Sequence, residues 1–556
     1  MARDSKRCSE GKRIDRFVRR RRFLGGAAAT GALALAGCLG GDDDDSENTQ
    51  TSDQGGYGDN TGTEPEDTGL TEEQKMGGTL RWGGAVPVQT LDPHLETAAA
   101  SARVFENVYE GLVQLNYDLT FSPHLASSME TSEDNTTLSF ELEQGVTFHD
   151  GSEMTSADVM ASLERVRNNE AYISYGFMQN VESMAAPGDY QFEIDLAEPF
   201  APFIAKLSTA ELAILPESEA AKDEITEPVG TGPFQYESRE IESSITLSRF
   251  DDYWNDEVDG PYLDEVVKSE ITDPSVRLQS FRAGEYDFIN GIPPREVEQV
   301  RNDPGVNFES IFPKALVYLG LNCNEAPFDD KHARLALDYS FSKQDATEAA
   351  LYGTGQATAT PAPPGSPWEH PDIEPRPRDL EQAQQHLDQA GLSDGFSVSF
   401  KIPQSYPAQV QAAQIIADQA SEVGIELDIQ RITWNSWLSD VYTDRNFQAT
   451  TSSYLALYYP DVSFYKFLHP DGAFFFTGWS NDEYNQLVED ARHMYDTQAR
   501  AEKYQRATEI LHEERAGHLM LFWQANLYGS QPNYKGRKGA PDGSTLRFHD
   551  NYFDDN

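Results

Sequence analysis

Residues 396–432 read FSVSFKIPQSYPAQVQAAQIIADQASEVGIELDIQRI. Val398, Phe400 and Ile402 alternate with polar residues, which is the period of a β-strand. Residues 408–423 carry a helical pattern that stops at a glycine, and a second alternating run follows. A strand, a helix and a second strand with short connections form a right-handed crossover, so the two strands are expected to be parallel. The pattern therefore predicts an α/β architecture.

Strand and helix patterns also alternate outside this unit. Residues 138–142 have the apolar alternation of a half-buried strand. Thr155 and Asp158 have the spacing of a capping box, which predicts the start of a helix. Residues 358–377 contain seven prolines and predict an irregular surface loop. We find no internal repeat.

Length and charge restrict the class of protein. A chain of 556 residues exceeds what one hydrophobic core usually supports, which predicts two or three lobes. Its 43 Lys and Arg stand against 93 Asp and Glu, a formal net charge of −50. Molar salt screens such a surface, because the Debye length falls to about 3 Å, so we interpret it as that of a halophile and expect a haloarchaeal source. Binding of cations or basic partners is the alternative, and nucleic acid is disfavoured because phosphate binding needs clustered Lys and Arg.

The N-terminus indicates export and anchoring. Arg20 and Arg21 begin the run RRRFL, which resembles the twin-arginine export signal. The uncharged run 23–39 is short for a transmembrane helix and suits a signal peptide. Cys38 closes the run LAGC, which resembles a lipobox. We therefore expect a signal peptide over 1–37, lipidation of Cys38, and a protein on the extracytoplasmic face of the cell membrane.

An acidic segment follows the expected lipidation site. Residues 38–76 include four consecutive aspartates, are rich in Gly, Thr, Ser, Asp and Glu, and contain few apolar residues. Such a composition buries too little apolar surface to offset the entropy of ordering. We expect this segment to be a flexible tether.

The motifs that would indicate catalysis are incomplete. His512 and His518 are six residues apart, too far to share a helical face as a zinc protease requires. Ser340 and Lys343 have the spacing of penicillin-binding enzymes, but no Lys-Thr-Gly partner exists. The tripeptide at 149–151, His-Asp-Gly, is typical of a turn. We expect no catalytic residue, no cofactor and no metal, hence not an enzyme.

A resemblance to a known family rests on several motifs. Residues 146–159 read VTFHDGSEMTSADV and resemble the family 5 extracellular solute-binding proteins, the dipeptide and oligopeptide receptors of ABC importers. Other landmarks occur in the family's order: LDP at 91–93, VGTGPF at 229–234, GPYLD at 260–264, GEYD at 284–287, APFDD at 326–330 and VGIEL at 423–427.

The resemblance implies a two-lobed, periplasmic-binding-protein-like α/β fold of type II, with mixed sheets, an extra inserted domain and a hinge between the lobes. On this basis we expect lobe I at 77–115, 228–310 and 515–556, the inserted domain at 116–227, and lobe II at 311–514.

The resemblance also suggests ligand-binding residues. Trp434 and Tyr454 match pocket-wall positions of peptide-binding relatives, where an aspartate pairs with the peptide's amino group. The matching place here holds Leu457 or Tyr458, so recognition of an amino group is in question, and Asp461 is a nearby substitute. We expect Trp434, Tyr454, Tyr458 and Asp461 to bind the ligand. Because aromatic residues crowd this region, an oligosaccharide is an alternative to a peptide.

The expected function is that of a monomeric receptor that captures a peptide-like solute between its two lobes and delivers it to the permease and ATPase subunits of an ABC importer. A surface hydrolase and a ligand sensor are the rival interpretations. Asn135 begins a glycosylation sequon, Asn-Thr-Thr, which we expect on an exported surface loop.

Overall fold

The structure is a computed structural model that describes residues 69–95, 99–117, 120–255, 260–455, 459–539 and 545–554. All of them belong to a compact unit formed by residues 59–556. The expected export and lipidation residues Arg20, Arg21 and Cys38 lie outside the described residues. Within the described part of the chain, no helix combines the length and the apolar character needed to cross a bilayer.

The end of the expected tether contains a short helix. Thr71 caps α1 (Glu72–Lys75) with a capping box that involves the Gln74 side chain. The Gly77 backbone N–H donates a 2.8 Å hydrogen bond to the Tyr262 carbonyl, and the Lys75 ammonium lies 5.0 Å from the centre of the Tyr262 ring. These contacts hold the helix against the folded unit.

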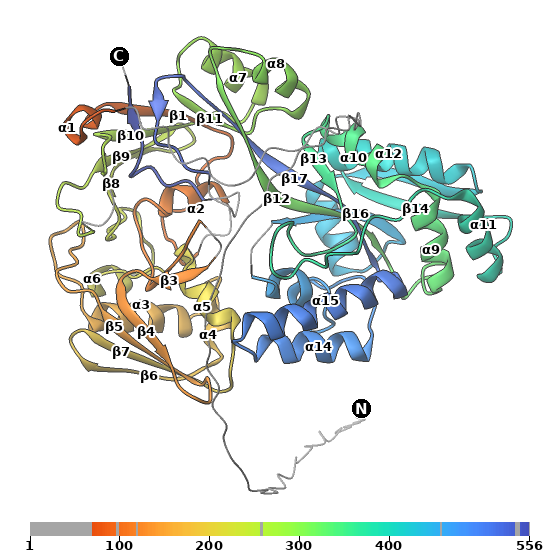
Figure 1. Cartoon of the computed structure of the whole chain (residues 1–556), viewed down its shortest axis with the longest axis horizontal. Helices are drawn as coiled ribbons and strands as arrows, with labels where there is room; N and C mark the ends of the chain where they lie inside the picture. Colours follow the sequence, from red (N-terminus) through yellow and green to blue (C-terminus); the bar gives the residue numbers. More distant parts are fainter. Residues whose placement is uncertain are drawn as a thin grey trace, which may run out of the picture. The chain divides into compact units, whose positions relative to one another are not determined.

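One mixed sheet of eleven strands forms the framework of the unit (Figure 1). In spatial order its path is β15 (Ile425–Ile432), β14 (Phe396–Pro403), β16 (Ala449–Leu455), β12 (Asn307–Leu321), β17 (His518–Ser530), β11 (Phe288–Asn290), β1 (Thr79–Gly84), β10 (Glu265–Glu270), β9 (Ser244–Arg249) and β8 (Phe234–Glu240), with β13 (Gly355–Ala357) paired to β17. We call β15, β14 and β16 the β14 half, and β11, β1, β10, β9 and β8 the β1 half.

The long antiparallel strands β12 and β17, here called the crossing pair, join the two halves. The end of β17 pairs with β11 in the β1 half, and the later part of β12 pairs with β16 in the β14 half. Figure 1 shows the pair running from one half to the other. The register shifts between Ile311 and Ala315, which face Asn526 and Gln524 respectively, so three residues of β12 oppose one of β17. This irregularity is a bulge at the point where the strands cross.

The predicted crossover at 396–432 is confirmed. β14 and β15 are parallel, with Phe396 opposite Ile425, and α12 (Pro407–Ser421) connects them. Both faces of the β14 half are covered by helices. Residues of α9 (Lys331–Ser340), α10 (Lys343–Leu351), α11 (Leu380–Gln389) and α12 belong to the core on one face, and residues of α14 (Asp482–Arg492) and α15 (Thr497–Glu514) belong to the core on the other. Along β12, Val317 and Leu319 enter one core and Leu316 and Tyr318 enter the other, as strand alternation requires.

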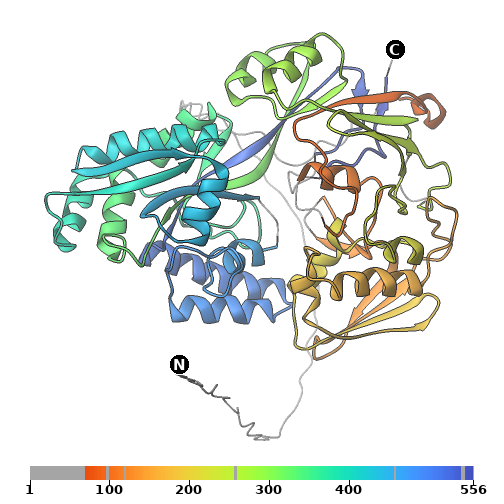
Figure 2. The same ribbon diagram turned by 180° about the vertical axis from the view of Figure 1, so that it is seen from behind.

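A second sheet packs beside the β1 half. Its order is β4 (Ala126–Thr131), β5 (Thr137–Leu142), β7 (Gln191–Leu196) and β6 (Val181–Gly188), and α3 (Ser156–Arg167) packs on β6 and β7 (Figure 2). The predicted capping box is confirmed, since the Asp158 carboxylate accepts a 2.8 Å hydrogen bond from the Thr155 backbone N–H. Asn135 lies in the turn between β4 and β5 and is partly exposed.

The proline-rich segment 358–377 is irregular, as expected, but the prediction that it lies on the surface is wrong for its first part. Residues 358–363 are buried, and Ala362 and Trp368 belong to a core of the β14 half. Prolines lack the backbone N–H that would need a partner in the interior. The Thr358 backbone N–H donates a hydrogen bond to the Leu521 carbonyl, and the Thr360 backbone N–H donates one to the Thr358 hydroxyl.

Candidate ligand-binding site

A cavity of about 570 Å³, here called the central cavity, lies where the two halves of the large sheet meet. The β1 half contributes the loop after β1, α2 (Ala99–Phe105) and residues 290–295. The β14 half contributes the end of α10, the start of α12 and the end of β16. The volume falls within the range of about 300–1,000 Å³ that is usual for small-molecule sites. The central cavity is therefore large enough to hold a small solute.

The crossing pair forms one wall of the central cavity at its bulge. Residues 524–527 of β17 line it, and Lys314, within the bulge of β12, lines it from the opposite strand. Bulges redirect side chains and interrupt strand pairing. Pro313, which has no N–H to donate to the ladder, precedes Lys314 in the same bulge. The local sequence therefore places a lysine at the junction of the two halves.

The charged side chains that line the central cavity among the described residues are all cations: Arg103, Arg295 and Lys314. Arg103 donates a 3.3 Å hydrogen bond to the Asn526 side-chain oxygen. Burial, together with the neighbouring cations Arg103 and Arg277, lowers the pKa of Lys314 to about 8. Burial likewise lowers the pKa of Arg277 to about 10, although its guanidinium donates to backbone carbonyls. The cavity therefore has a positive electrostatic character.

Trp434 lies near the central cavity but does not line it. It begins α13 (Trp434–Trp437), is 39% exposed, and stacks on Trp437 with ring centres 5.0 Å apart and planes 5° apart. Tyr406 packs edge-on against Trp434 at 5.6 Å and directly precedes Pro407, a lining residue. Trp434 thus presents an exposed ring close to one side of the cavity.

Tyr454 is placed in a hydrophobic core. It is 5% exposed and stacks on Phe467 at 4.5 Å. Leu455, the next residue of β16, lines the central cavity. Because successive residues of a strand point to opposite faces, Tyr454 points away from the face that Leu455 shares with the cavity. Tyr458 lies outside the described residues.

Asp461 is engaged in an ion pair within the protein. It begins the helical turn η4 (Asp461–Lys466) and is 1% exposed, and its Oδ1 accepts a 2.5 Å hydrogen bond from the Arg492 Nε. It is not among the residues that line the central cavity. Three of the residues expected to bind the ligand are described by the structure, and none of these three lines the central cavity: Trp434, Tyr454 and Asp461.

Lys314 and Arg103 were not identified from the sequence. The signal that indicates Lys314 is local: residues 310–321 read SIFPKALVYLGL, an apolar strand interrupted by Pro-Lys. A proline inside a strand marks an edge or a bulge, and a lysine in such a run needs a special environment. Arg103 lies in a short helix whose neighbours give no comparable signal.

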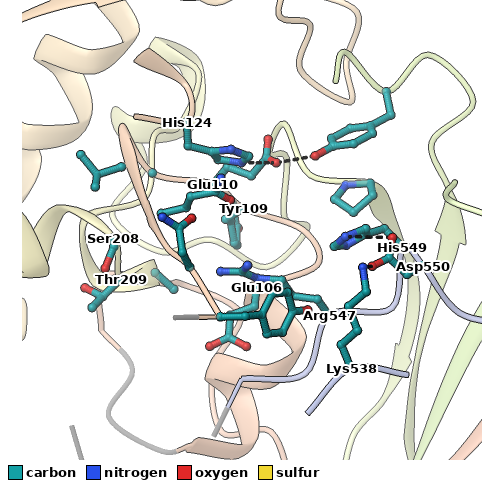
Figure 3. Close-up of a pocket in the computed structure, with 18 residues that line it drawn as sticks. Glu106, Tyr109, Glu110, His124, Ser208, Thr209, Lys538, Arg547, His549 and Asp550 are labelled. Carbon is teal, nitrogen blue, oxygen red and sulfur yellow. Dashed lines mark hydrogen bonds and ion pairs between the residues drawn. The ribbon is translucent and has the colours of Figure 1, made fainter. Parts of the chain in front are cut away.

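A second cavity of about 370 Å³ lies beside the β1 half, between residues 106–117, residues 208–210 and the side chains of Lys538, Arg547, His549 and Asp550 (Figure 3). Its carboxylate Glu110 is bound by several protein groups, including His124 and the hydroxyl of Tyr253, each at 2.8 Å. Lys538 and Asp550 form a 2.6 Å ion pair across it. These charges are neutralised within the protein, so we regard the central cavity as the better candidate.

The motifs tested for catalysis are occupied by structural contacts. Ser340 donates a 2.7 Å hydrogen bond to the Leu337 carbonyl, and Lys343 lies 3.5 Å from the Asp338 carboxylate. His512 lies on α15 and His518 on β17, so they belong to different elements.

Elsewhere, the side-chain atoms of His469, Asp471 and Glu489 that could bind a metal ion lie within 4.8 Å of one another. These residues do not line the central cavity.

The fold has two halves, a connecting strand pair and a cavity between the halves, and this is the arrangement of the periplasmic-binding-protein fold of type II. The family model "Bacterial extracellular solute-binding proteins, family 5 Middle" matches residues 120–475. The chain belongs to this family of extracellular solute-binding proteins.

Two curated relatives illustrate the similarity. The glutathione-binding protein GsiB of Salmonella typhimurium (strain LT2) is 28% identical over 346 residues, which cover 61% of this chain and 67% of the relative. The dipeptide-binding protein of Escherichia coli (strain K12) is 27% identical over 442 residues, which cover 73% of this chain and 82% of the relative.

Solved structures are similar over most of the chain. DppA from Helicobacter pylori, in complex with the peptide STSA, has a TM-score of 0.72 and 26% identity, and the match covers 87% of this chain and 99% of DppA. NikA from Brucella suis, in complex with Fe(III)-EDTA, has a TM-score of 0.78 and 24% identity over 86% of this chain and 100% of NikA. The second match shows the shared fold.

Proposed function

We propose that this protein is the extracytoplasmic receptor of an ABC importer, and that it captures a small peptide-like solute in the central cavity and delivers it to the membrane permease. The observation that carries the proposal is the position of the cavity, between two sheet halves joined by the crossing pair. A solute held there contacts both halves, so its binding energy favours the closed arrangement. The peptide-binding relatives support the choice of solute class.

A second solute class is favoured by one observation. The exposed ring of Trp434, stacked on Trp437 and beside Tyr406, is a surface on which the apolar face of a sugar can stack. An oligosaccharide receptor of the same importer class is therefore the alternative. A surface hydrolase and a ligand sensor are less well supported.

The remaining features of the proposal come from the sequence. We propose lobe I at 77–115, 228–310 and 515–556, the inserted domain at 116–227, and lobe II at 311–514. We also propose export by the twin-arginine route, lipidation of Cys38, a monomeric state and a halophilic host. On this view the protein binds its solute reversibly and performs no covalent chemistry.

The experiment that tests the proposal is a thermal-shift screen in molar KCl against dipeptides, longer peptides and oligosaccharides. A bound solute stabilises the folded state in proportion to the logarithm of its concentration over Kd, so at 100 times Kd it adds about 2.7 kcal/mol. Small-angle scattering with and without the solute checks closure. Conversion of the solute by the purified protein contradicts the proposal.

A further inference from the structure

We propose that the solute captured in the central cavity is an anion, and that Lys314 and Arg103 bind its carboxylate or equivalent acidic group. This inference rests on the proposed receptor function and specifies the chemical class of the solute. It concerns a site that the sequence motifs do not identify.

The first argument is the contrast between the cavity and the rest of the chain. The protein has 93 acidic and 43 basic residues, so a solvent-exposed surface is expected to be dominated by carboxylates. The described residues that line the central cavity include three cations and no carboxylate. The charge of the cavity lining is therefore opposite in sign to the charge expected for the rest of the surface, and such a lining favours an anionic solute.

The second argument is the environment of Lys314. Among the described residues, the charged groups that perturb the Lys314 ammonium are the cations Arg103 and Arg277, and no carboxylate is among them. A cation in partial burial among other cations is costly unless an anion neutralises it. A bound acidic group supplies that anion.

The third argument concerns the amino group of a peptide. A buried ammonium needs a carboxylate partner. Asp461, the expected substitute, is buried, paired with Arg492 and absent from the cavity lining. An ammonium in the cavity would instead meet Lys314 and its neighbouring cations. A solute with a net negative charge, such as an acidic peptide or an organic acid, fits the lining better than an amine.

The position of Lys314 links this recognition to the proposed closure. Its bulge lies in the strands that join the two halves, whereas Arg103 belongs to α2 in the β1 half. An acidic group held by both side chains therefore bridges the crossing pair and the β1 half.

The test is a binding screen in molar KCl with pooled solutes of known charge. Three peptide pools differ at one position, with Glu, Gln or Lys, and a fourth pool contains organic acids without an amino group. Solutes retained by the purified protein are identified by mass spectrometry. Retention of the Glu pool or of organic acids supports the inference, and these two arms distinguish the sources of the acidic group. Retention restricted to neutral or Lys-containing solutes contradicts the inference that the solute is an anion, but leaves the proposed receptor function intact. Retention of nothing contradicts the receptor function, and the inference falls with it.

Variants then test the residue. Lys314→Gln is expected to weaken binding of the retained anion by about 10- to 100-fold, the usual effect of removing a charged hydrogen bond. Lys314→Arg, which keeps the charge, is expected to restore most of the affinity. Lys222→Gln, which changes an exposed lysine outside the lining of the cavity, is the matched control. Without solute, Lys314→Gln should melt at the same temperature as the native protein or higher, because it removes a cation from among cations. Equal affinity of Lys314→Gln and native protein for the anion overturns the assignment.

Discussion

Asp461 and Arg492 form an ion pair in which the Arg492 Nε donates a 2.5 Å hydrogen bond to the Asp461 Oδ1. The Arg492 guanidinium also lies 3.5 Å from the centre of the Tyr465 ring, and the Arg492 carbonyl accepts a 2.8 Å hydrogen bond from the Ala201 backbone N–H. The ion pair therefore fixes η4 against the end of α14. The hydrogen bond from Ala201 connects the same end of α14 to the segment that follows β7. This arrangement indicates a structural role for Asp461.

The structural role of Asp461 can be tested by substitution. Arg492→Ala leaves a buried carboxylate without its partner and is expected to lower the free energy of unfolding by about 3 kcal/mol. Asp461→Asn should cost less, about 1–3 kcal/mol, and change the affinity for the solute by less than about twofold. Chemical denaturation in molar KCl and calorimetric titration measure the two quantities. Lys503→Ala, which breaks a surface ion pair with Asp490, is the control and should cost less than about 1 kcal/mol. A large loss of solute affinity in Asp461→Asn would show that Asp461 binds the solute.

The affinity for an anionic solute is expected to depend on pH through Lys314. Burial and the cations Arg103 and Arg277 lower the pKa of Lys314 to about 8, so without solute its charge is lost as the pH rises through that value. An anion favours the charged form. Affinity should therefore stay constant up to about pH 8 and then fall, by at most about tenfold per pH unit.

Calorimetric titration between pH 6 and pH 10 checks this dependence. The other groups that face Lys314 or share its cavity are Arg103 of α2, Arg277 of α7 (Pro274–Arg282), Arg295 of η2 (Pro294–Glu296) and Tyr352 after α10. Arg277, with its pKa of about 10, keeps its charge at pH 8. In Lys314→Gln the fall near pH 8 should disappear. If it persists there, another group controls it.

The local elements of the fold could be predicted from the sequence, because their signals are short-range. The alternation of Val398, Phe400 and Ile402 and the capping box at Thr155 depend on residues within one turn or one strand. The crossing pair could not be predicted in this way, because its pairing joins Ala315 to Gln524, residues distant in sequence. The motif resemblance supplied the two-lobed arrangement instead.

The candidate site was harder to predict, because it too depends on contacts between residues that are distant in sequence. Trp434 and Tyr454 were chosen by their position in a motif. Because side chains alternate along a strand, Tyr454 points into a hydrophobic core, whereas its neighbour Leu455 lines the central cavity. A shift of one residue along a strand reverses the face, and an alignment at low identity does not fix the register. Lys314 enters the cavity because of a bulge, which the alternation pattern does not describe.

The acidic composition predicts a dependence of stability on salt. With a formal net charge of −50, the folded protein repels itself in dilute buffer, and screening relieves this repulsion. We expect the melting temperature to rise steadily between 0.1 M and 3 M KCl. Differential scanning calorimetry measures the change, and tetramethylammonium chloride at equal ionic strength separates screening from binding of K⁺. A melting temperature that does not change with salt would contradict the halophilic interpretation.

Asp338 is expected to be essential for stability, because three cations surround its fully buried carboxylate. Arg515, Lys343 and Arg376 lie 3.3, 3.5 and 3.7 Å from it. Burial alone would raise the pKa of Asp338, but these cations hold it below its ordinary value, so its contribution is present at neutral pH and is lost as the pH falls below about 4. Asp338→Asn leaves the cations unpaired and should lower the free energy of unfolding by about 3–5 kcal/mol in urea denaturation. Asp418→Asn, on the exposed face of α12, should change it by less than about 0.5 kcal/mol. Equal unfolding midpoints for the two variants would show that the Asp338 carboxylate is not needed to stabilise the surrounding cations.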